Sequence, residues 1–339
     1  MVERQSVTTR DIADQLDLSV STVGRALSHD PRITLETRFR VEQKAAELGY
    51  VGNLAARLMR GVKSTVVGLM VPDVRNSFYT TAAHSLAQVL GQQGFQVMLS
   101  ETDDNRDTEL AQLKGLLAAQ VAGVILVPTP QPHPGSVRLL KNVPHVQFLR
   151  HRPEIGDHWF GVDDRGVLRQ ATEHLLGLGH RRIAFLGDGP GRSTSTQRLG
   201  GFIDAMGGAA VSELVVQTPP ASSEAAREAV GRLLSLPVPP SALVTASVRI
   251  TEGVLQELSA RDVGVPAQLS VVGFGDEPGF SWWGPGLTTM ALPVQEVATA
   301  CSMWLLQRLS GNGSDTPYTS SAGGYLVQRG STTPAEPTS

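Results

Sequence analysis

The stretch that decides the N-terminal fold is residues 7–27, which read VTTRDIADQLDLSVSTVGRAL. Thr8, with Asp11 three positions later, has the spacing of a capping box that starts a helix. Asp17 tolerates the left-handed conformation that a tight turn requires, and Ser19 is a good N-cap for a second helix. The stretch therefore predicts two short helices joined by a tight turn.

The second of these helices, residues 20–27, has one apolar face and one polar face. The polar face carries Val20, Ser21 and Arg25 near its N-terminal end. A third helix, over residues 34–48, would close a small core. Exposed side chains at the start of a second helix are what reading the major groove of DNA requires. The alternative is a helical hairpin whose outer face is only solvated.

Beyond residue 64 the pattern changes to short apolar runs that alternate with helical stretches. The apolar runs are residues 66–71, 121–127, 183–186, 242–245 and 270–274. The helical stretches are residues 81–93, 107–119, 166–178, 223–236 and 251–261. Repeated strand and helix pairs predict an α/β fold with two doubly wound parallel-sheet lobes and a ligand cleft between them.

The composition, 41% hydrophobic and 18% charged over 339 residues, is that of a globular protein with a large core. The sequence has no apolar run long enough for a membrane helix, and its first residues do not resemble a signal peptide. We therefore expect a cytoplasmic protein with no membrane partner. The formal net charge of −3 is no argument for nucleic-acid binding, which has to rest on the helical motif.

Motifs of common enzymes are missing from the sequence: it has no Gly-x-x-x-x-Gly-Lys, His-Glu-x-x-His or Gly-x-Ser-x-Gly. His174 and His180 flank a predicted helix end without a third metal ligand at a suitable spacing. The glycine-rich residues 187–191 lack the spacing of a dinucleotide site. We therefore expect no catalytic residues, no metal site and no cofactor.

Motifs along nearly the whole chain resemble the LacI/GalR (lactose repressor) family. The helical part carries VTxxDIA at 7–13, SxxTVxRxL at 19–27, TRxRV at 37–41 and ELGYxxNxxAR at 47–57. The remainder carries VPDxxNxF at 71–78, HLLxLGHRRIAFLG at 174–187, RxxGF at 198–202 and VVGF at 271–274. The resemblance implies a DNA-binding transcription regulator, expected to be a repressor, with a sensor of the periplasmic-binding-protein type.

The resemblance also implies a division of the chain into domains. A helix-turn-helix DNA-binding domain would span residues 1–52, and a hinge helix residues 53–61. Residues 62–330 would form a two-lobed domain for effector binding and dimerisation. The polar residues 331–339 are expected to be a disordered tail. Because one short recognition helix makes few base contacts, we expect a homodimer on a pseudopalindromic operator.

The DNA-binding residues implied by the resemblance lie in the second helix, at the helix starts and in the hinge. They are Thr8, Ser19, Val20, Ser21, Thr22, Arg25, Asn53, Ala56, Arg57 and Met59. Arg25 would pair bidentately with a guanine, and Thr22 would anchor a phosphate. Met59 replaces the leucine that the family wedges into the minor groove. The alternative for Met59 is that the hinge only tethers two domains.

The effector-binding residues implied by the resemblance are Asp73, Phe78, Arg150, Arg198, Arg249 and Asp276. Arg198 matches an arginine that the family uses to hold an effector hydroxyl or carboxylate. Leu149, Ser247 and Gly275 stand at strand ends where sugar-responsive members carry acidic or amide groups. This exchange favours an anionic effector, such as a sugar acid or sugar phosphate. The alternative is a neutral sugar, with the arginines solvated.

Two other classes of function are open to a chain of this pattern. A solute-binding protein that feeds a transporter shares the sensor fold, but it needs an export signal and has no DNA-reading module. An enzyme with a DNA-binding appendage needs a nucleophile, a metal or an acid–base pair, which the sequence does not offer. A gel shift with operator fragments separates the regulator from both.

Overall fold

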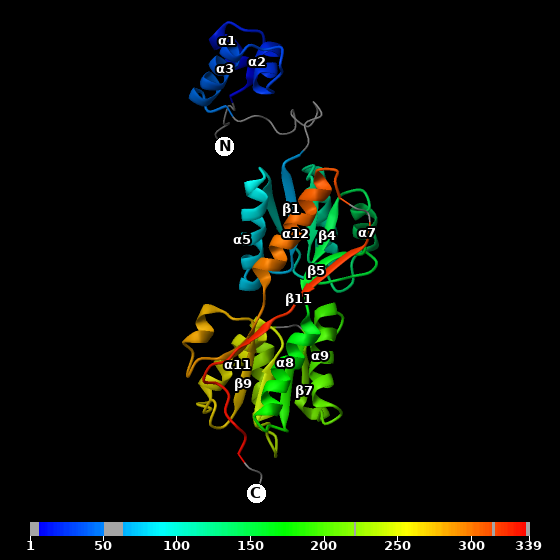
Figure 1. Ribbon diagram of the computed structural model, residues 1–339, viewed down its shortest axis with the longest axis vertical. Helices are drawn as coiled ribbons and strands as arrows, with labels where there is room; N and C mark the ends of the chain where they lie inside the picture. Colours follow the sequence, from blue (N-terminus) through cyan, green and yellow to red (C-terminus); the bar gives the residue numbers. More distant parts are fainter. Residues whose placement is uncertain (1–6, 51–63, 220–221, 314–315, 337–339) are drawn as a thin grey trace. The chain divides into compact units, whose positions relative to one another are not determined.

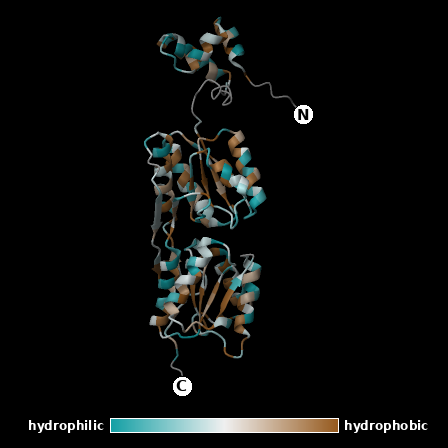
Figure 2. Ribbon diagram, turned by 90° about the vertical axis from the view of Figure 1, so that its right-hand side faces the viewer, coloured by the Kyte–Doolittle hydropathy of each residue, from teal (hydrophilic) through white to brown (hydrophobic). Residues whose placement is uncertain are grey.

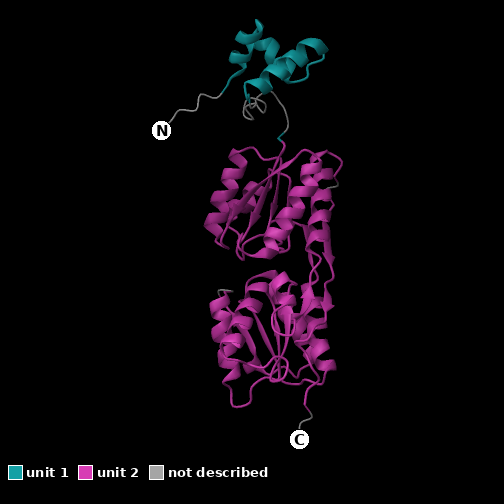
Figure 3. Ribbon diagram, turned by 90° about the vertical axis from the view of Figure 1, so that its left-hand side faces the viewer, with its two compact units in different colours: residues 1–64 teal, residues 65–339 magenta. Residues whose placement is uncertain are grey.

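The computed structural model describes residues 7–50, 64–219, 222–313 and 316–336. The chain divides into two compact units, residues 1–64 and residues 65–339 (Figure 3). The hinge helix predicted over residues 53–61 lies outside the described residues.

The first unit is helical, as predicted, with α1 (Thr9–Leu16), α2 (Val20–Leu27) and α3 (Leu35–Glu47). The predicted capping box is present, because the Thr8 amide donates to Asp11 Oδ2 at 2.6 Å. Asp17 makes the tight turn in the left-handed conformation, with φ of 55°. The helices meet in a small core of Ile12, Ala13, Val23, Ala26, Val41 and Ala45.

The second unit contains two six-stranded sheets, each of which forms the centre of one lobe. The first sheet has the order β11-β5-β4-β3-β1-β2. Its strands are β1 (Val66–Val71), β2 (Gln96–Glu101), β3 (Gly123–Leu126), β4 (His145–Phe148), β5 (His158–Val162) and β11 (Tyr318–Ala322). All its neighbouring strands are parallel, as predicted for a doubly wound lobe.

The second sheet has the order β12-β10-β9-β8-β6-β7. Its strands are β6 (Ile183–Asp188), β7 (Val215–Thr218), β8 (Ala242–Thr245), β9 (Ser270–Phe274), β10 (Thr288–Ala291) and β12 (Tyr325–Val327). Only β12, at the edge, runs antiparallel to its neighbour β10. The strands in the middle of both sheets are mostly apolar, and the helices packed on them turn polar residues outward (Figure 2).

The helices divide between the two lobes. The first lobe has α5 (Ser77–Gln92), α6 (Arg106–Ala118), α7 (Pro134–Leu140) and α12 (Val294–Leu309). The second lobe has α8 (Asp164–Gly177), α9 (Ser193–Met206), α10 (Ser223–Leu234) and α11 (Val248–Ala260), with 3-10 turns η1 (Ser212–Leu214) and η2 (Pro278–Ser281). Among the described residues, no helix is both long and apolar enough to cross a membrane.

Neither lobe is built from one continuous segment. The chain leaves the first lobe after β5, builds most of the second lobe, and returns to the first lobe with α12. It then adds β11 to the first sheet and β12 to the second (Figure 1). Three connections, β5–α8, β10–α12 and β11–β12, therefore join the lobes.

The prediction of a disordered tail is wrong for residues 331–336, which lie against the second lobe. Ser331 is fully buried: its Oγ donates to Val271 O at 2.6 Å and accepts from the Thr288 amide at 2.7 Å. The Thr333 carbonyl lies 3.0 Å from His180 Nε2, and the Ala335 amide donates to Leu178 O at 2.8 Å. Hydrogen bonds to buried backbone groups order this tail, although its composition is polar.

We predict that Ser331→Ala lowers the stability of the second unit by about 1–3 kcal/mol, because it leaves the buried Thr288 amide without its acceptor. Thermal and urea unfolding of the purified protein would measure this. Ser310→Ala, which removes an exposed hydroxyl at the end of α12, is the matched control. Equal stability of the two variants would mean that the tail contributes nothing to the lobe.

Candidate functional site

The outward face of α2 is the candidate site of the first unit. Val20 is 43% exposed, and Ser21 and Arg25 are exposed as well. The Nε of Arg25 donates to Ser21 O at 3.3 Å, so the guanidinium lies along the helix surface next to Ser21. The structure thus brings these three predicted DNA-contacting residues together on one accessible face.

Three other predicted DNA-contacting residues hold the helix starts. The Ser19 Oγ accepts from the Thr22 amide at 3.1 Å and lies 2.8 Å from Thr22 Oγ1. Thr8 caps α1 through its bonds with Asp11. These hydroxyls satisfy backbone groups that a helix end leaves free. The remaining predicted residues, Asn53, Ala56, Arg57 and Met59, lie outside the described part of the chain.

The candidate site of the second unit is a cavity of about 330 Å³ between the lobes. Its residues come from loops and helix starts that follow the carboxyl ends of parallel strands in both sheets. This is where ligands bind in doubly wound folds. Five of the six predicted effector-binding residues line the cavity: Asp73, Phe78, Arg150, Arg198 and Arg249.

The sixth residue, Asp276, does not line this cavity. Its carboxylate forms an ion pair with Arg329 Nη1 at 2.7 Å and accepts from Thr289 Oγ1 at 2.8 Å. Gly275 turns the chain with φ of 82° immediately after β9. Arg329 follows β12, the antiparallel edge strand that the sequence pattern did not reveal. The partner that holds Asp276 therefore came from an unpredicted strand.

Arg198, on α9, lines the same cavity, and its side chain is largely buried. Its Nε donates to Asp164 Oδ1 at 2.6 Å, its Nη1 donates to Ala246 O at 2.7 Å, and its guanidinium lies 4.1 Å from the ring centroid of Phe274. Burial raises the pKa of Asp164, although the positive charge of Arg198 opposes this shift. Two bonds and a ring face therefore fix the Arg198 guanidinium, with Nε and Nη1 engaged.

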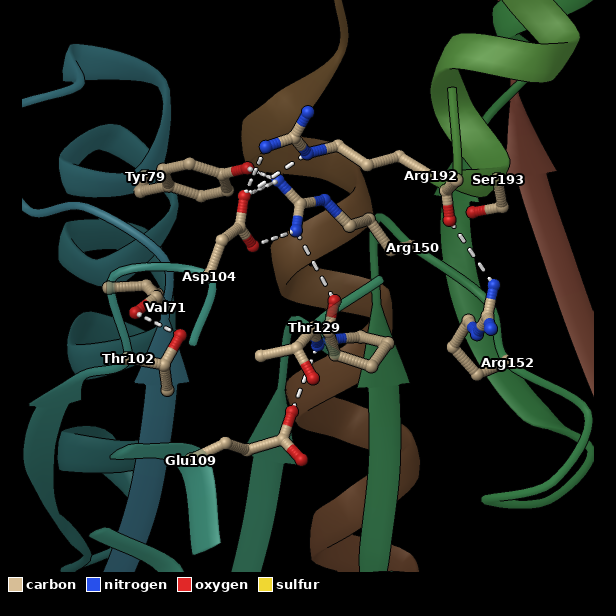
Figure 4. Close-up of polar contacts among 12 residues, drawn as sticks. Val71, Tyr79, Thr102, Asp104, Glu109, Thr129, Arg150, Arg152, Arg192 and Ser193 are labelled. Atoms are coloured by element: carbon tan, nitrogen blue, oxygen red, sulfur yellow. Dashed lines mark hydrogen bonds and ion pairs between the residues drawn. The ribbon is translucent and has the colours of Figure 1, made fainter. Parts of the chain in front are cut away.

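Asp104 lies between two arginines, as Figure 4 shows. Arg150 forms a bidentate pair with it, with Nη2 donating to Oδ2 at 3.2 Å, and Arg192 Nη2 donates to Oδ2 at 2.7 Å. Burial alone would raise the pKa of Asp104, but the two arginines outweigh it and hold the pKa below its usual range. Arg150 also donates to the Tyr79 hydroxyl at 3.3 Å.

Asp73 also lies between two arginines. It forms ion pairs with Arg75, at 3.0 Å, and with Arg249, whose Nη2 donates to Oδ2. Burial alone would raise the pKa of Asp73, but the hydrogen bonds from Arg75 and the charges of both arginines lower it.

Leu149 takes the left-handed conformation, with φ of 64°, immediately before Arg150. Such a conformation is unusual for a bulky residue and is often found at functional sites.

The cavity carries five arginines and five aspartates, so the formal charges of these ten residues cancel. The arginines are Arg75, Arg150, Arg192, Arg198 and Arg249, and the aspartates are Asp73, Asp103, Asp104, Asp164 and Asp188. The sequence analysis predicted three of these arginines, but of the five aspartates it predicted only Asp73. Asp104 lies in the loop after β2, which was not predicted, whereas Asp164 begins α8, shortly after β5, and Asp188 ends β6. Their position at strand ends was the signal that could have found them.

No group of His, Cys, Asp and Glu side chains suited to hold a metal ion occurs within the described ranges. Cys301 is fully buried, and burial raises the pKa of its thiol. The neighbouring aromatic residues Trp282 and Trp283 do not line the cavity.

Comparisons with known proteins match both units. Residues 8–53 match the model of bacterial regulatory proteins of the lacI family, and residues 172–332 match the model of a periplasmic binding protein-like domain. The HTH-type transcriptional repressor CytR of Escherichia coli (strain K12) is 25% identical over 312 residues, which cover 91% of this chain and 92% of that protein.

Two solved structures have the same fold. The lac repressor dimer bound to operator and an anti-inducer superposes with a TM-score of 0.84 at 22% identity, covering 97% of this chain and 100% of that one. The complex of the transcriptional regulator CelR with cellobiose gives a TM-score of 0.72 at 25% identity, covering 96% and 99%. Together with the two model matches, these findings show that the chain carries a helix-turn-helix domain of the lacI family of bacterial regulatory proteins, followed by a periplasmic-binding-protein-like domain, with the fold of the lac repressor.

Proposed function

We propose that this protein is a transcriptional repressor that binds a pseudopalindromic operator as a homodimer and releases or retains it according to a small metabolite bound between its lobes. The observation that carries the proposal is the joint presence of an exposed reading face on α2 and a polar cavity between two lobes. A target in chromosomal DNA puts the proposed site of action in the cytoplasm. A gel shift with fragments from its own promoter region tests the proposal.

The two other classes of function fit less well. A solute-binding protein does not require a DNA-binding domain such as residues 8–53, which match the lacI-family model. For an enzyme, the cavity would need a nucleophile or an acid–base pair, yet its five carboxylates face arginines, serines or solvent. We propose that these charges bind and position a ligand.

For DNA reading, we predict that Arg25→Ala weakens operator binding by about 1–3 kcal/mol and relaxes the preference for guanine at one position of each half-site. The physical reason is that an exposed guanidinium can donate two hydrogen bonds to one guanine. Gel shifts on a library of operator variants would measure both effects.

Arg25→Lys is the matched variant for this experiment, because it retains the positive charge but not the planar fork. It should keep binding to random DNA and lose the guanine preference. Arg25 contacts only phosphate if Arg25→Ala weakens binding to all operator sequences alike and Arg25→Lys restores binding to all of them.

For the homodimer, we propose that the first lobe contributes the edge strand β2. This strand pairs on one side only, with β1, and it exposes Met98 (41%) and Leu99 (45%). An exposed apolar edge strand is a site where a second chain pairs or packs. Two copies related by a two-fold axis would bring two recognition helices to the two half-sites.

We expect Met98→Glu to shift the dimer to monomers and to reduce operator affinity at least about tenfold, because a buried unpaired charge disfavours the interface. Sedimentation velocity at several protein concentrations would measure the shift. Val238→Glu is the matched control. It places the same charge on another exposed apolar residue (59% exposed), which precedes β8 in the second lobe. A monomeric wild type, or a Met98→Glu dimer as tight as the wild type, would contradict the role given to β2.

For the effector, we propose a sugar derivative with an anionic group, such as a sugar acid or sugar phosphate, whose anionic group contacts Arg198. Nε and Nη1 of Arg198 are engaged, so we assign the contact to Nη2. The arginine excess around Asp73 and around Asp104, two guanidinium groups to one carboxylate in each case, supports an anionic ligand. Asp188, whose carboxylate accepts from Ser247 at 3.0 Å, is proposed to bind the ligand's hydroxyls.

A thermal-shift screen of neutral sugars, sugar acids and sugar phosphates tests this proposal. We predict that an acidic sugar raises the unfolding temperature of the wild type, and that Arg198→Gln loses most of this rise while Arg165→Gln keeps it. Arg165 pairs with Asp204 at 2.6 Å on the outside of the second lobe. Comparing the ligand-induced rise, rather than the unfolding temperature itself, separates ligand binding from the structural role of Arg198. A neutral sugar that stabilises wild type and Arg198→Gln equally, and changes operator binding, would show that the ligand is not anionic.

A further inference from the structure

Two ion pairs cross the cavity from one lobe to the other. Asp73 follows β1 in the first lobe and pairs with Arg249 on α11 of the second lobe. Asp104 follows β2 in the first lobe and pairs with Arg192, the N-cap of α9, at 2.7 Å. Arg198 differs from these, because its partner Asp164 belongs to the same lobe.

We propose that the pairs Asp73–Arg249 and Asp104–Arg192 form an electrostatic latch that holds the two lobes closed when no ligand is bound. The latch deepens the proposed function, since it concerns the cavity to which the effector is assigned. It goes beyond ligand recognition because it assigns these four side chains a role in the ligand-free protein.

Each latch carboxylate is oriented by an arginine of its own lobe. Arg75, two residues after Asp73, donates its amide and its Nε to Asp73 Oδ1. Arg150 holds Asp104 through a bidentate pair. The carboxylates therefore face the second lobe before closure, so little side-chain entropy is lost when the cross-lobe bonds form. The arginines keep the pKa of both aspartates low, and both remain charged at neutral pH.

The burial of the latch places it between a surface ion pair and a core ion pair. The side chains of Arg249 and Asp73 are 28% and 16% exposed, and those of Arg192 and Asp104 are 16% and 19% exposed. Partly buried pairs are stronger than fully exposed pairs, yet salt still reaches and screens them. The closed arrangement should therefore weaken as the ionic strength rises.

Two further hydrogen bonds join the lobes without a pair of opposite charges. The His151 amide donates to Ser193 Oγ at 3.1 Å, and Arg152 Nη1 donates to Gly191 O at 3.3 Å. Salt screens these bonds less than it screens the two ion pairs, because only one partner or neither is charged. A strong salt dependence of lobe closure would thus point to the latch.

The latch also predicts how an anionic ligand acts. A ligand whose anionic group contacts Arg198 lies in the same cavity as Arg192 and Arg249. Any further acceptor group of the ligand that reaches Arg249 or Arg192 competes with Asp73 or Asp104, so it breaks a cross-lobe pair or replaces it with a bridge through the ligand. The ligand then changes lobe closure only to the extent that its bridge is stronger or weaker than the aspartate that it displaces.

The experiment measures the distance between the lobes in the full-length protein without any ligand or DNA. Spin labels are attached to cysteines at two exposed positions, Lys114 on α6 of the first lobe and Glu228 on α10 of the second. Cys301 is fully buried and is expected to remain unlabelled in the folded protein. Pulsed electron paramagnetic resonance then gives the distance distribution from about 0.05 M to about 0.5 M NaCl, over which the Debye length shortens severalfold.

We expect one short distance at low salt and a second, longer population that grows with NaCl. The double variant Arg192→Gln/Arg249→Gln should show the longer population at low salt already, with the ratio of open to closed protein raised roughly tenfold. Arg165→Gln, which removes an arginine of the same lobe from an ion pair within that lobe, should behave like the wild type.

A double variant with the distance distribution of the wild type would overturn the latch, as would a wild-type distribution that does not change with salt. If the double variant does not fold, as judged by circular dichroism, the single variants Arg192→Gln and Arg249→Gln and the wild-type salt series decide the matter. Because no ligand is present, failure of the latch leaves the proposed effector-binding role untouched. Conversely, the thermal-shift screen can fail while the salt-dependent closure is observed.

Discussion

The parallel pairing of strands within each sheet is the constraint on which the second unit depends. In a parallel sheet every strand ends at the same edge, so the loops that follow the strands gather there. The two lobes turn these edges toward one another, and three connections join the lobes. Side chains as distant in sequence as Asp73 and Arg249 thereby meet across one cavity.

Charge pairing follows from this convergence. Ten charged side chains line a cavity of about 330 Å³, and partial burial makes each unpaired charge costly. An arginine can hold a carboxylate with two parallel hydrogen bonds, so pairing offsets the desolvation cost of both charges. A pocket assembled in this way is polar and ordered before any ligand enters. It is also poised, because each pair that crosses between the lobes can be exchanged for a bond to a ligand.

The first unit solves a different problem, which is stability at small size. Its core has six fully or nearly fully buried side chains, so the helix ends have to contribute. The hydroxyls of Thr8, Ser19 and Thr34 each accept from a backbone amide at the start of a helix. Val20, Ser21 and Arg25 take no part in this core. They lie on the outer face of α2, where they can contact another molecule.

The sequence by itself determined the local structure of this protein, because helix caps, apolar periodicity and buried strands depend on neighbours in the chain. Thr8 with Asp11, Asp17 in its turn, and the apolar strands near residues 66, 183, 242 and 270 were all readable. Strands β2, β11 and β12 were not, because these edge strands mix apolar and polar residues and lack the continuous apolar run of a buried strand. Likewise, five residues that line the cavity could be named from the resemblance and from departures from it, yet the partners of their arginines could not.

Only the tertiary structure decided which charges meet. The pairing of Arg192 with Asp104, and of Arg329 with Asp276, joins residues 88 and 53 positions apart, and no local pattern encodes such a separation. The same is true of the tail, where Ser331 is ordered by Val271 and Thr288 and not by its own polar neighbours. Propensity acts between residues close in sequence, whereas ion pairs and buried hydrogen bonds depend on where the completed sheets bring the chain.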